Sequence, residues 1–148
     1  KLKPPLRSEK DRLETIEAVR DGTIDIISSM HTPQDEESKR LPFEDAASGA
    51  IGLETILPAM LRLYHSNHLK MDQIFNAISL KPAKRLGLAC GSLKHKKIAD
   101  LIIFDADKPF ILNRELLHSK VKNTPFDGHK LQGQVLRTFV KGKEVFSL

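Results

Sequence analysis

The chain has 148 residues, 40% of them hydrophobic and 29% charged, which predicts a globular domain of ordinary size with a hydrophobic core. Its net charge of +5 is spread over short basic pairs and few aromatic residues accompany them, so we do not expect nucleic-acid binding. No stretch approaches about 18 uninterrupted apolar residues, which argues against membrane insertion. The single cysteine, Cys90, fits a reducing cytoplasm, and the start at Lys1 suggests a fragment or a processed chain.

The first half of the chain alternates between helical and strand patterns. Residues 8–22 predict an amphipathic helix, with Ser8 as N-cap and Gly22 as its stop. Residues 23–28, TIDIIS, are apolar at nearly every position, as expected of a strand buried in a parallel sheet. Residues 31–50 are polar and predict a long functional loop. Helices are expected over 51–66, 71–78 and 82–87, so this half is of the α/β class.

The second half is rich in β-structure. Residues 99–105 predict a compact strand, and residues 108–112 are extended around a proline. Residues 134–148 predict two strands joined by a tight turn at 141–143. We therefore divide the chain into an α/β part, residues 1–90, and a β part, residues 91–148.

Five blocks of sequence follow one another in a characteristic order: KPPLRSEKDR, DGTIDIISSMHTPQDEESKRLPFEDAASGAIGLET, PAKRLGL, ADLIIFDADKPF and SKVKNTPFDGHKLQGQVLRTFVKGKEVF. In order and spacing they resemble the C-terminal portion of class I dihydroorotases, which are cyclic amidohydrolases of pyrimidine biosynthesis. The resemblance implies the closing part of a metal-dependent (β/α)8 barrel, with 23–28 as its last strand, followed by part of a small β-sandwich domain. A complete barrel takes about 250 residues, so only part of one fits here.

The resemblance also assigns roles to individual positions. The family motif after the last strand is Asp-His-x-Pro-His or Asp-His-x-Pro-Gln; here His31, Pro33 and Gln34 match, whereas Met30 replaces the aspartate. That carboxylate contacts the metal and accepts a proton, and a thioether does neither well. The resemblance places Lys3 where the family has a substrate-binding Asn, and Ser48-Gly49 where it has Phe-Gly. We therefore expect no intact catalytic residue and no metal ligand, with Lys3, Gln34, Ser48 and Gly49 as weakly supported substrate contacts.

Several of these residues also have structural explanations. His31 is expected to hydrogen-bond the loop rather than to act in catalysis. Asp25 faces away from Met30 and is an unlikely substitute base. The two histidines at 65 and 68 have a spacing that a metal can use, but surface positions explain them better. One residue of the acidic run 35–37 is a candidate to compensate for the missing aspartate, but solvated carboxylates explain the run better. Lys39 and Arg40 either steer an anionic substrate, contact a partner or balance this run, and Asn123 and Pro125 are interpreted as turn residues.

Two functional hypotheses follow from the resemblance. In the first, the chain is part of a dihydroorotase, which interconverts N-carbamoyl-aspartate and dihydroorotate in the cytoplasm with a zinc centre supplied by residues upstream; the chain alone is inactive and binds no zinc. In the second, it is a non-catalytic dihydroorotase-like scaffold for aspartate carbamoyltransferase. A hydantoinase or allantoinase relative is a weaker alternative. An incomplete barrel exposes a strand edge and apolar helix faces, so we expect it to associate with its missing half, another copy or a partner.

Overall fold

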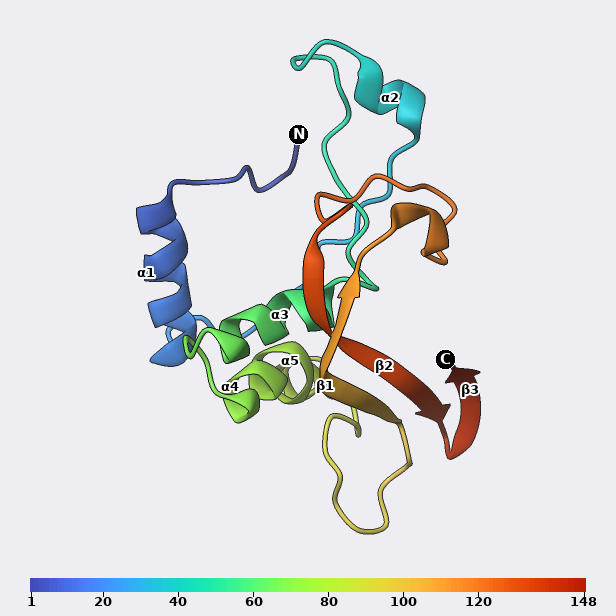
Figure 1. Ribbon diagram of the computed structural model, residues 1–148. Coiled ribbons are helices and arrows are strands. Elements are labelled where there is room, and N and C mark those ends of the chain that lie inside the picture. Colours follow the sequence, from blue (N-terminus) through green and yellow to red (C-terminus); the bar gives the residue numbers. More distant parts are fainter.

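The computed structural model describes all 148 residues, and it combines a group of helices with a small antiparallel sheet (Figure 1). The helices are α1 (Glu9–Arg20), α2 (Glu36–Arg40), α3 (Ile56–His65), α4 (Met71–Phe75), the π-helical turn η1 (Asn76–Leu80), α5 (Lys81–Arg85) and the 3₁₀ turn η2 (Arg114–Leu116). The strands are β1 (Leu101–Ile111), β2 (Lys130–Val140) and β3 (Lys143–Ser147). None of the helices combines the length and the hydrophobicity that a transmembrane segment requires.

Helix α1 forms where the sequence predicts it. Ser8 has extended backbone angles and accepts a hydrogen bond from the Asp11 backbone N–H, while the Asp11 carboxylate accepts one from the Ser8 N–H. This capping box satisfies two donors that have no partner inside the helix. Ile16 and Val19 on its buried face pack with Leu69 and Ile74, which forms the main hydrophobic cluster.

The predicted buried strand at 23–28 is wrong for this chain. These residues form no strand, and Ile26 is 39% exposed. A strand forms only where another strand lies beside it to complete the hydrogen-bonded ladder. Here the Ile27 N–H instead donates to the Ala77 carbonyl of η1, and the only parallel pairing nearby is a single bridge between His31 and Ala50.

The helices that follow differ from the predictions mainly at their ends. Within 31–50, α2 interrupts the expected loop, because Asp35 caps it by accepting from the Ser38 N–H. Helix α3 begins at Ile56 rather than at 51, because the preceding residues form a turn in which the Ile56 N–H donates to the Gly52 carbonyl. The predicted helices at 71–78 and 82–87 form one continuous helical segment through η1, which ends before Gly87 at φ +68°.

The sheet has the order β1-β2-β3 and is antiparallel throughout. The two extended pieces expected at 99–105 and 108–112 belong to one strand, β1, whose register shifts accommodate Pro109 at the edge of the sheet. The predicted tight turn after β2 is confirmed: Lys141 and Gly142 both have positive φ, as in the two-residue hairpin turns that match strand twist.

Helix α3 packs against the sheet, and the contact depends on a glycine in β2 (Figure 1). Leu61 is fully buried, and a Cβ built on Gly133 would collide with its Cδ1. At the end of α3, the His65 ring lies 3.0 Å from the Ala106 carbonyl of β1. His65 is thus a half-buried contact between helix and sheet, which corrects the expectation that it lies on the surface.

Candidate functional site

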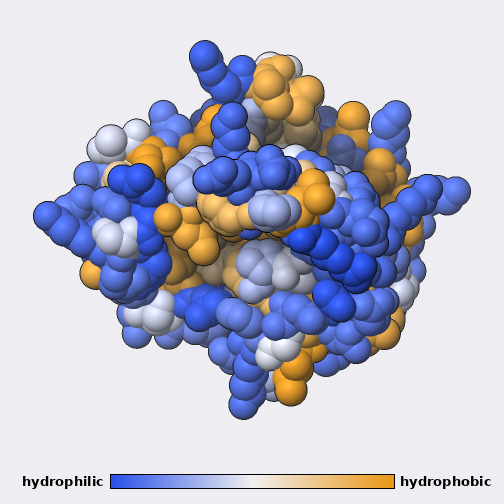
Figure 2. Space-filling view, turned by 90° about the horizontal axis from the view of Figure 1, so that it is seen from above, coloured by the Kyte–Doolittle hydropathy of each residue, from blue (hydrophilic) through white to orange (hydrophobic).

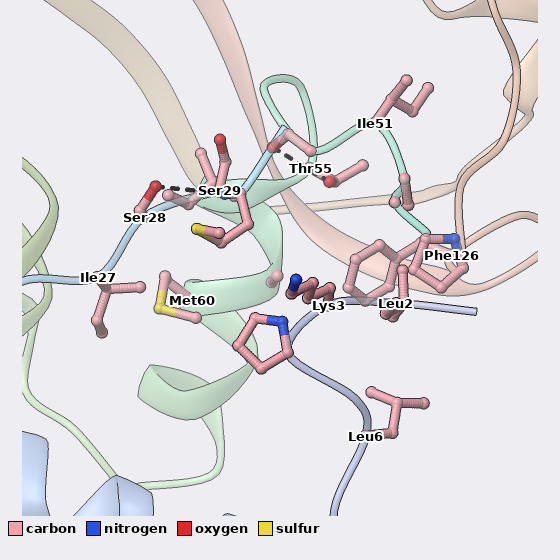
Figure 3. Close-up of a pocket in the computed structure, with 18 residues that line it drawn as sticks. Leu2, Lys3, Leu6, Ile27, Ser28, Ser29, Ile51, Thr55, Met60 and Phe126 are labelled. Atoms are coloured by element: carbon pink, nitrogen blue, oxygen red, sulfur yellow. Dashed lines mark hydrogen bonds between the residues drawn. The ribbon is translucent and has the colours of Figure 1, made fainter. Parts of the chain in front are cut away.

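A cavity of about 410 Å³ opens where the N-terminal segment, the residues before His31, the start of α3 and a C-terminal loop meet (Figure 3). Its volume falls in the range of small-molecule pockets. Of the predicted site residues, Lys3, Met30 and Gly49 line it, whereas His31, Pro33, Gln34 and Ser48 do not. The lining is mostly hydrophobic and comprises Leu2, Lys3, Pro4, Leu6, Ile27, Ser28, Ser29, Met30, Gly49, Ala50, Ile51, Gly52, Thr55, Ile56, Ala59, Met60, Pro125 and Phe126.

Met30 lies at the cavity in a left-handed backbone conformation, with φ +46°. Its N–H donates to the Ser28 hydroxyl at 3.3 Å, and its carbonyl accepts from the Thr32 hydroxyl at 3.0 Å. Among non-glycine residues, Asn, Asp and His are the ones enriched in this conformation. The backbone therefore favours a short polar residue such as aspartate, although the side chain present is a thioether that is 57% exposed.

His31 has a hydrogen-bonding role beneath the cavity. Its ring Nδ1 accepts a hydrogen bond from the Gly52 backbone N–H at 3.0 Å, and the Thr32 N–H donates to the Ala50 carbonyl at 2.8 Å. Because Nδ1 is the acceptor, the proton of a neutral ring is on Nε2. The histidine holds the turn before α3 against the residues that follow Met30.

Asn123 links three of the loops around the cavity, which the sequence did not reveal. Its Nδ2 donates to the Gly49 carbonyl at 3.1 Å, and its Oδ1 accepts a longer bond, 3.5 Å, from the Gln34 N–H. Its backbone carbonyl accepts from the Ile51 N–H at 3.0 Å. The Gln34 side chain in turn donates to the Ser48 carbonyl at 3.2 Å. Asn123 thus does more than set a turn, because it joins the segment before Pro125 and Phe126 to the loop over residues 31–51, which we call the site loop.

Lys39 also makes hydrogen bonds beside the cavity that the sequence did not reveal. Its ammonium group donates to the carbonyls of Lys1, Ala47 and Gly49 at 2.9, 2.9 and 3.0 Å. The Gly49 N–H also donates to the Lys1 carbonyl at 3.0 Å. Lys39 therefore holds the N-terminal segment against the loop, and of its expected roles the balancing of the acidic run is wrong.

The acidic run itself is used within α2. Hydrogen bonds from the Ser38 backbone hold the pKa of Asp35 below its ordinary value, consistent with its N-cap role. Arg40 pairs with Glu36 at 2.8 Å and with Glu37 at 3.1 Å, so the expectation for Arg40 is confirmed. None of these carboxylates lines the cavity.

Glu54 links residues 118–119, in the second half of the chain, to the turn before α3 through hydrogen bonds. Its carboxylate accepts from the backbone N–H groups of His118 and Ser119, at 3.1 and 3.2 Å, and lies 3.0 Å from the His118 ring. Burial opposes ionisation of Glu54, but these hydrogen bonds outweigh it and leave its pKa below the ordinary value.

No three His, Cys, Asp or Glu side chains lie together in a way that could hold a metal ion. His65 is turned toward the sheet, and Asp25 pairs with Lys81 at 2.8 Å outside the cavity. The donor set of this chain thus does not fit the tetrahedral nitrogen, sulfur and carboxylate ligation that zinc prefers.

Solved structures show which known fold this chain shares. L-hydantoinase (dihydropyrimidinase) from Arthrobacter aurescens aligns with a TM-score of 0.93 and 33% identity over 99% of this chain and 34% of that one. Dihydropyrimidinase from Brevibacillus agri aligns with a TM-score of 0.93 at 23% identity over 99% of this chain and 33% of that one, which shows the fold alone. The fold is a partial TIM barrel with a small sheet, as predicted.

The sequence comparison places the chain more narrowly. The profile of the amidohydrolase family matches residues 2–145, and the chain belongs to that family. Proteins named dihydroorotase from Wolbachia of Drosophila simulans and from Ehrlichia chaffeensis are both 42% identical over 99% of this chain. The chain spans about a third of the length of these relatives, 33% in each. The resemblance to part of a dihydroorotase is therefore confirmed, and proteins of this family are generally metal-dependent.

Proposed function

We propose that the chain is the C-terminal portion of a cytoplasmic dihydroorotase-type protein of pyrimidine biosynthesis and that it does not hydrolyse dihydroorotate alone. The observation that carries the proposal is 42% identity to proteins named dihydroorotase across nearly the whole chain. The sequence relatives are more similar to it than the hydantoinase structures, which supports dihydroorotase over hydantoinase.

In this proposal the chain supplies one wall of the substrate site. Lys3 and the backbone at Gly49 face the cavity, while Gln34 and Ser48 support the loop through the bond between them. No carboxylate or histidine lines the cavity, so the chain has no group there to accept a proton from an attacking water at neutral pH. The zinc ion expected of an active family member would activate that water, and we propose that its ligands lie outside these 148 residues.

A second function, that of a non-catalytic scaffold, is favoured by Met30. The residue at the position of the family aspartate has no basicity, whereas the fold around it is retained. Large hydrophobic side chains such as Leu6, Leu93 and Leu116 are 84, 86 and 79% exposed, and Figure 2 shows hydrophobic side chains at several places among polar ones, which leaves apolar surface that a partner chain would cover. We propose the missing half of the barrel, a second copy or aspartate carbamoyltransferase as the partner.

One experiment distinguishes the two functions. The gene product is purified with its natural flanking sequence, its zinc content is measured, and hydrolysis of dihydroorotate is assayed for the wild type and for Met30→Asp. Readily measured turnover of the wild type, together with bound zinc, would support the dihydroorotase function and contradict the non-catalytic scaffold. Absence of turnover, together with co-elution with aspartate carbamoyltransferase in size-exclusion chromatography, supports the scaffold. If the gene product shows no turnover and does not co-elute with aspartate carbamoyltransferase, both functions are contradicted.

A further inference from the structure

The positive charge of the chain is concentrated in one segment. Residues 81–100, which we call the basic segment, hold six lysines and arginines and one acidic residue, so their formal charge is +5. This equals the charge of the whole chain, because the other residues carry 18 basic and 18 acidic side chains, which cancel. Basic pairs occur along the whole chain, but in this segment the acidic residues that would balance them are missing. A local excess of one sign attracts ligands of the opposite charge.

The structure places the basic segment on a projecting part of the molecule. The segment begins in α5 and continues as the loop before β1, which extends beyond the helices in the lower part of Figure 1. Hydrogen bonds hold the loop at both ends. The Leu88 N–H donates to the Ala83 carbonyl at 2.8 Å, and the Ala99 carbonyl accepts from the Gly142 N–H at 2.9 Å. The loop thus presents its charges from a fixed position on the fold.

Most charges of the basic segment have no partner within the chain. Lys81 is the exception, because it pairs with Asp25 at 2.8 Å. The acidic residue of the segment, Asp100, accepts a hydrogen bond from the Lys141 backbone N–H at 2.7 Å. The five cations that are exposed and make no ion pair are Lys84, Arg85, Lys94, Lys96 and Lys97. These cations repel one another, so a ligand with several negative charges is favoured over a single anion.

The composition of the basic segment favours carboxylates over nucleic-acid phosphates. The segment contains no aromatic residue on which bases could stack. Four of its five unpaired cations are lysines, whereas arginine is the side chain that matches a phosphate through two parallel hydrogen bonds. Clustered carboxylates are what an acidic protein surface provides.

Hydrophobic side chains accompany these charges. Leu86, Leu88, Leu93 and Ile98 are 71, 54, 86 and 57% exposed. Protein interfaces combine an apolar centre with a polar rim, whereas a segment that binds a membrane surface usually carries its apolar residues on one face of an amphipathic helix. Residues 86–100 form no helix. We propose that the basic segment is a docking surface for a partner protein, which contacts it through an acidic stretch that carries apolar side chains.

This docking surface lies outside the substrate cavity, so it is tested by binding alone. The probe is a short fluorescein-labelled peptide of glutamate and leucine, added at low salt to the gene product with its natural flanking sequence, and fluorescence anisotropy measures its affinity. A peptide with glutamine in place of glutamate removes the charge, and one with alanine in place of leucine removes the apolar side chains. Vesicles of phosphatidylserine and phosphatidylcholine in equal parts, and double-stranded DNA, test the other anionic partners.

Two triple variants separate a local docking surface from the overall charge of the protein, because each of them loses three positive charges. The segment variant combines Lys94→Gln, Lys96→Gln and Lys97→Gln. The matched control changes exposed lysines elsewhere that make no ion pair, and it combines Lys108→Gln, Lys120→Gln and Lys130→Gln.

We expect the peptide of glutamate and leucine to bind the wild type and the control variant equally, and the segment variant roughly 10-fold more weakly. The glutamine and alanine peptides should each bind the wild type roughly 10-fold more weakly than this peptide. The inference is overturned if this peptide does not bind, if either altered peptide binds as tightly, if the two triple variants have the same affinity, or if vesicles or DNA bind more tightly than the peptide. Turnover of dihydroorotate, measured separately, tests the proposed function alone.

Discussion

Asn123 offers the sharpest test of how the site is held together. Replacing it with alanine removes the 3.1 Å bond to the Gly49 carbonyl and the weaker 3.5 Å bond from the Gln34 N–H, while the backbone bond to Ile51 remains. One good hydrogen bond contributes about 1 kcal/mol, and a partly buried N–H left without a partner adds to the cost. We expect Asn123→Ala to lower the free energy of unfolding by about 1–2 kcal/mol.

For a chain of this length that loss corresponds to a fall in Tm of roughly 2–8 °C, measured by circular dichroism. Asn123→Asp should be at least as destabilising, because a carboxylate cannot donate to the Gly49 carbonyl and would repel it. Asn76→Ala in η1 is the matched control, since no hydrogen bond of the Asn76 side chain contributes to the site loop. A Tm for Asn123→Ala within 1 °C of the wild type, or an Asn123→Asp variant as stable as the wild type, would refute the reasoning.

Three further changes test other parts of the structure. Met30→Asn should raise stability by up to about 1 kcal/mol in urea denaturation, because asparagine tolerates the φ of +46° better; a loss of stability would contradict this. Gly133→Ala should cost about 1–3 kcal/mol more than Gly128→Ala, because both glycines have positive φ but only the first would press a Cβ against Leu61; equal losses would contradict the packing contact. Glu54 has a lowered pKa in the folded protein, so its stabilising effect is present above the unfolded value of 4.5 and lost as pH falls below it. Glu54→Gln should therefore lower the Tm more at pH 7 than at pH 3, and a pH-independent difference would contradict that.

Local sequence was enough to predict the parts of the fold that local contacts create. The N-cap of α1 involves residues three positions apart, Ser8 and Asp11, and the hairpin turn at Lys141 and Gly142 needs only its own backbone angles. The strand predicted at residues 23–28 was wrong for the opposite reason, because a strand depends on contacts with segments distant in the sequence. Their composition is that of a barrel strand, but a strand exists only through its neighbours, and this chain places none beside it.

The contacts that hold the candidate site could not be found in the same way. Asn123 lies 74 residues from Gly49 and 89 from Gln34, and no periodicity links such positions. Lys39 follows an acidic run, so the nearest carboxylates were its obvious partners; its ammonium instead reaches backbone carbonyls up to 38 residues away. Residue types suggested where the site is, whereas the bonds that shape it depend on the tertiary structure.

Met30 stands where the resemblance implies an aspartate, and its surroundings indicate how the two side chains would differ at this site. The hydrogen bonds from the Met30 N–H to the Ser28 hydroxyl and from the Thr32 hydroxyl to the Met30 carbonyl involve only the backbone of Met30, so neither bond needs a particular side chain at this position. An aspartate here would place a negative charge in a cavity whose single charge is the ammonium of Lys3, and the two would partly neutralise each other. With methionine the wall is apolar and Lys3 has no counterion in the cavity. Compared with the aspartate that the resemblance implies for the family, methionine thus offers no proton acceptor and no partner for the charge of Lys3.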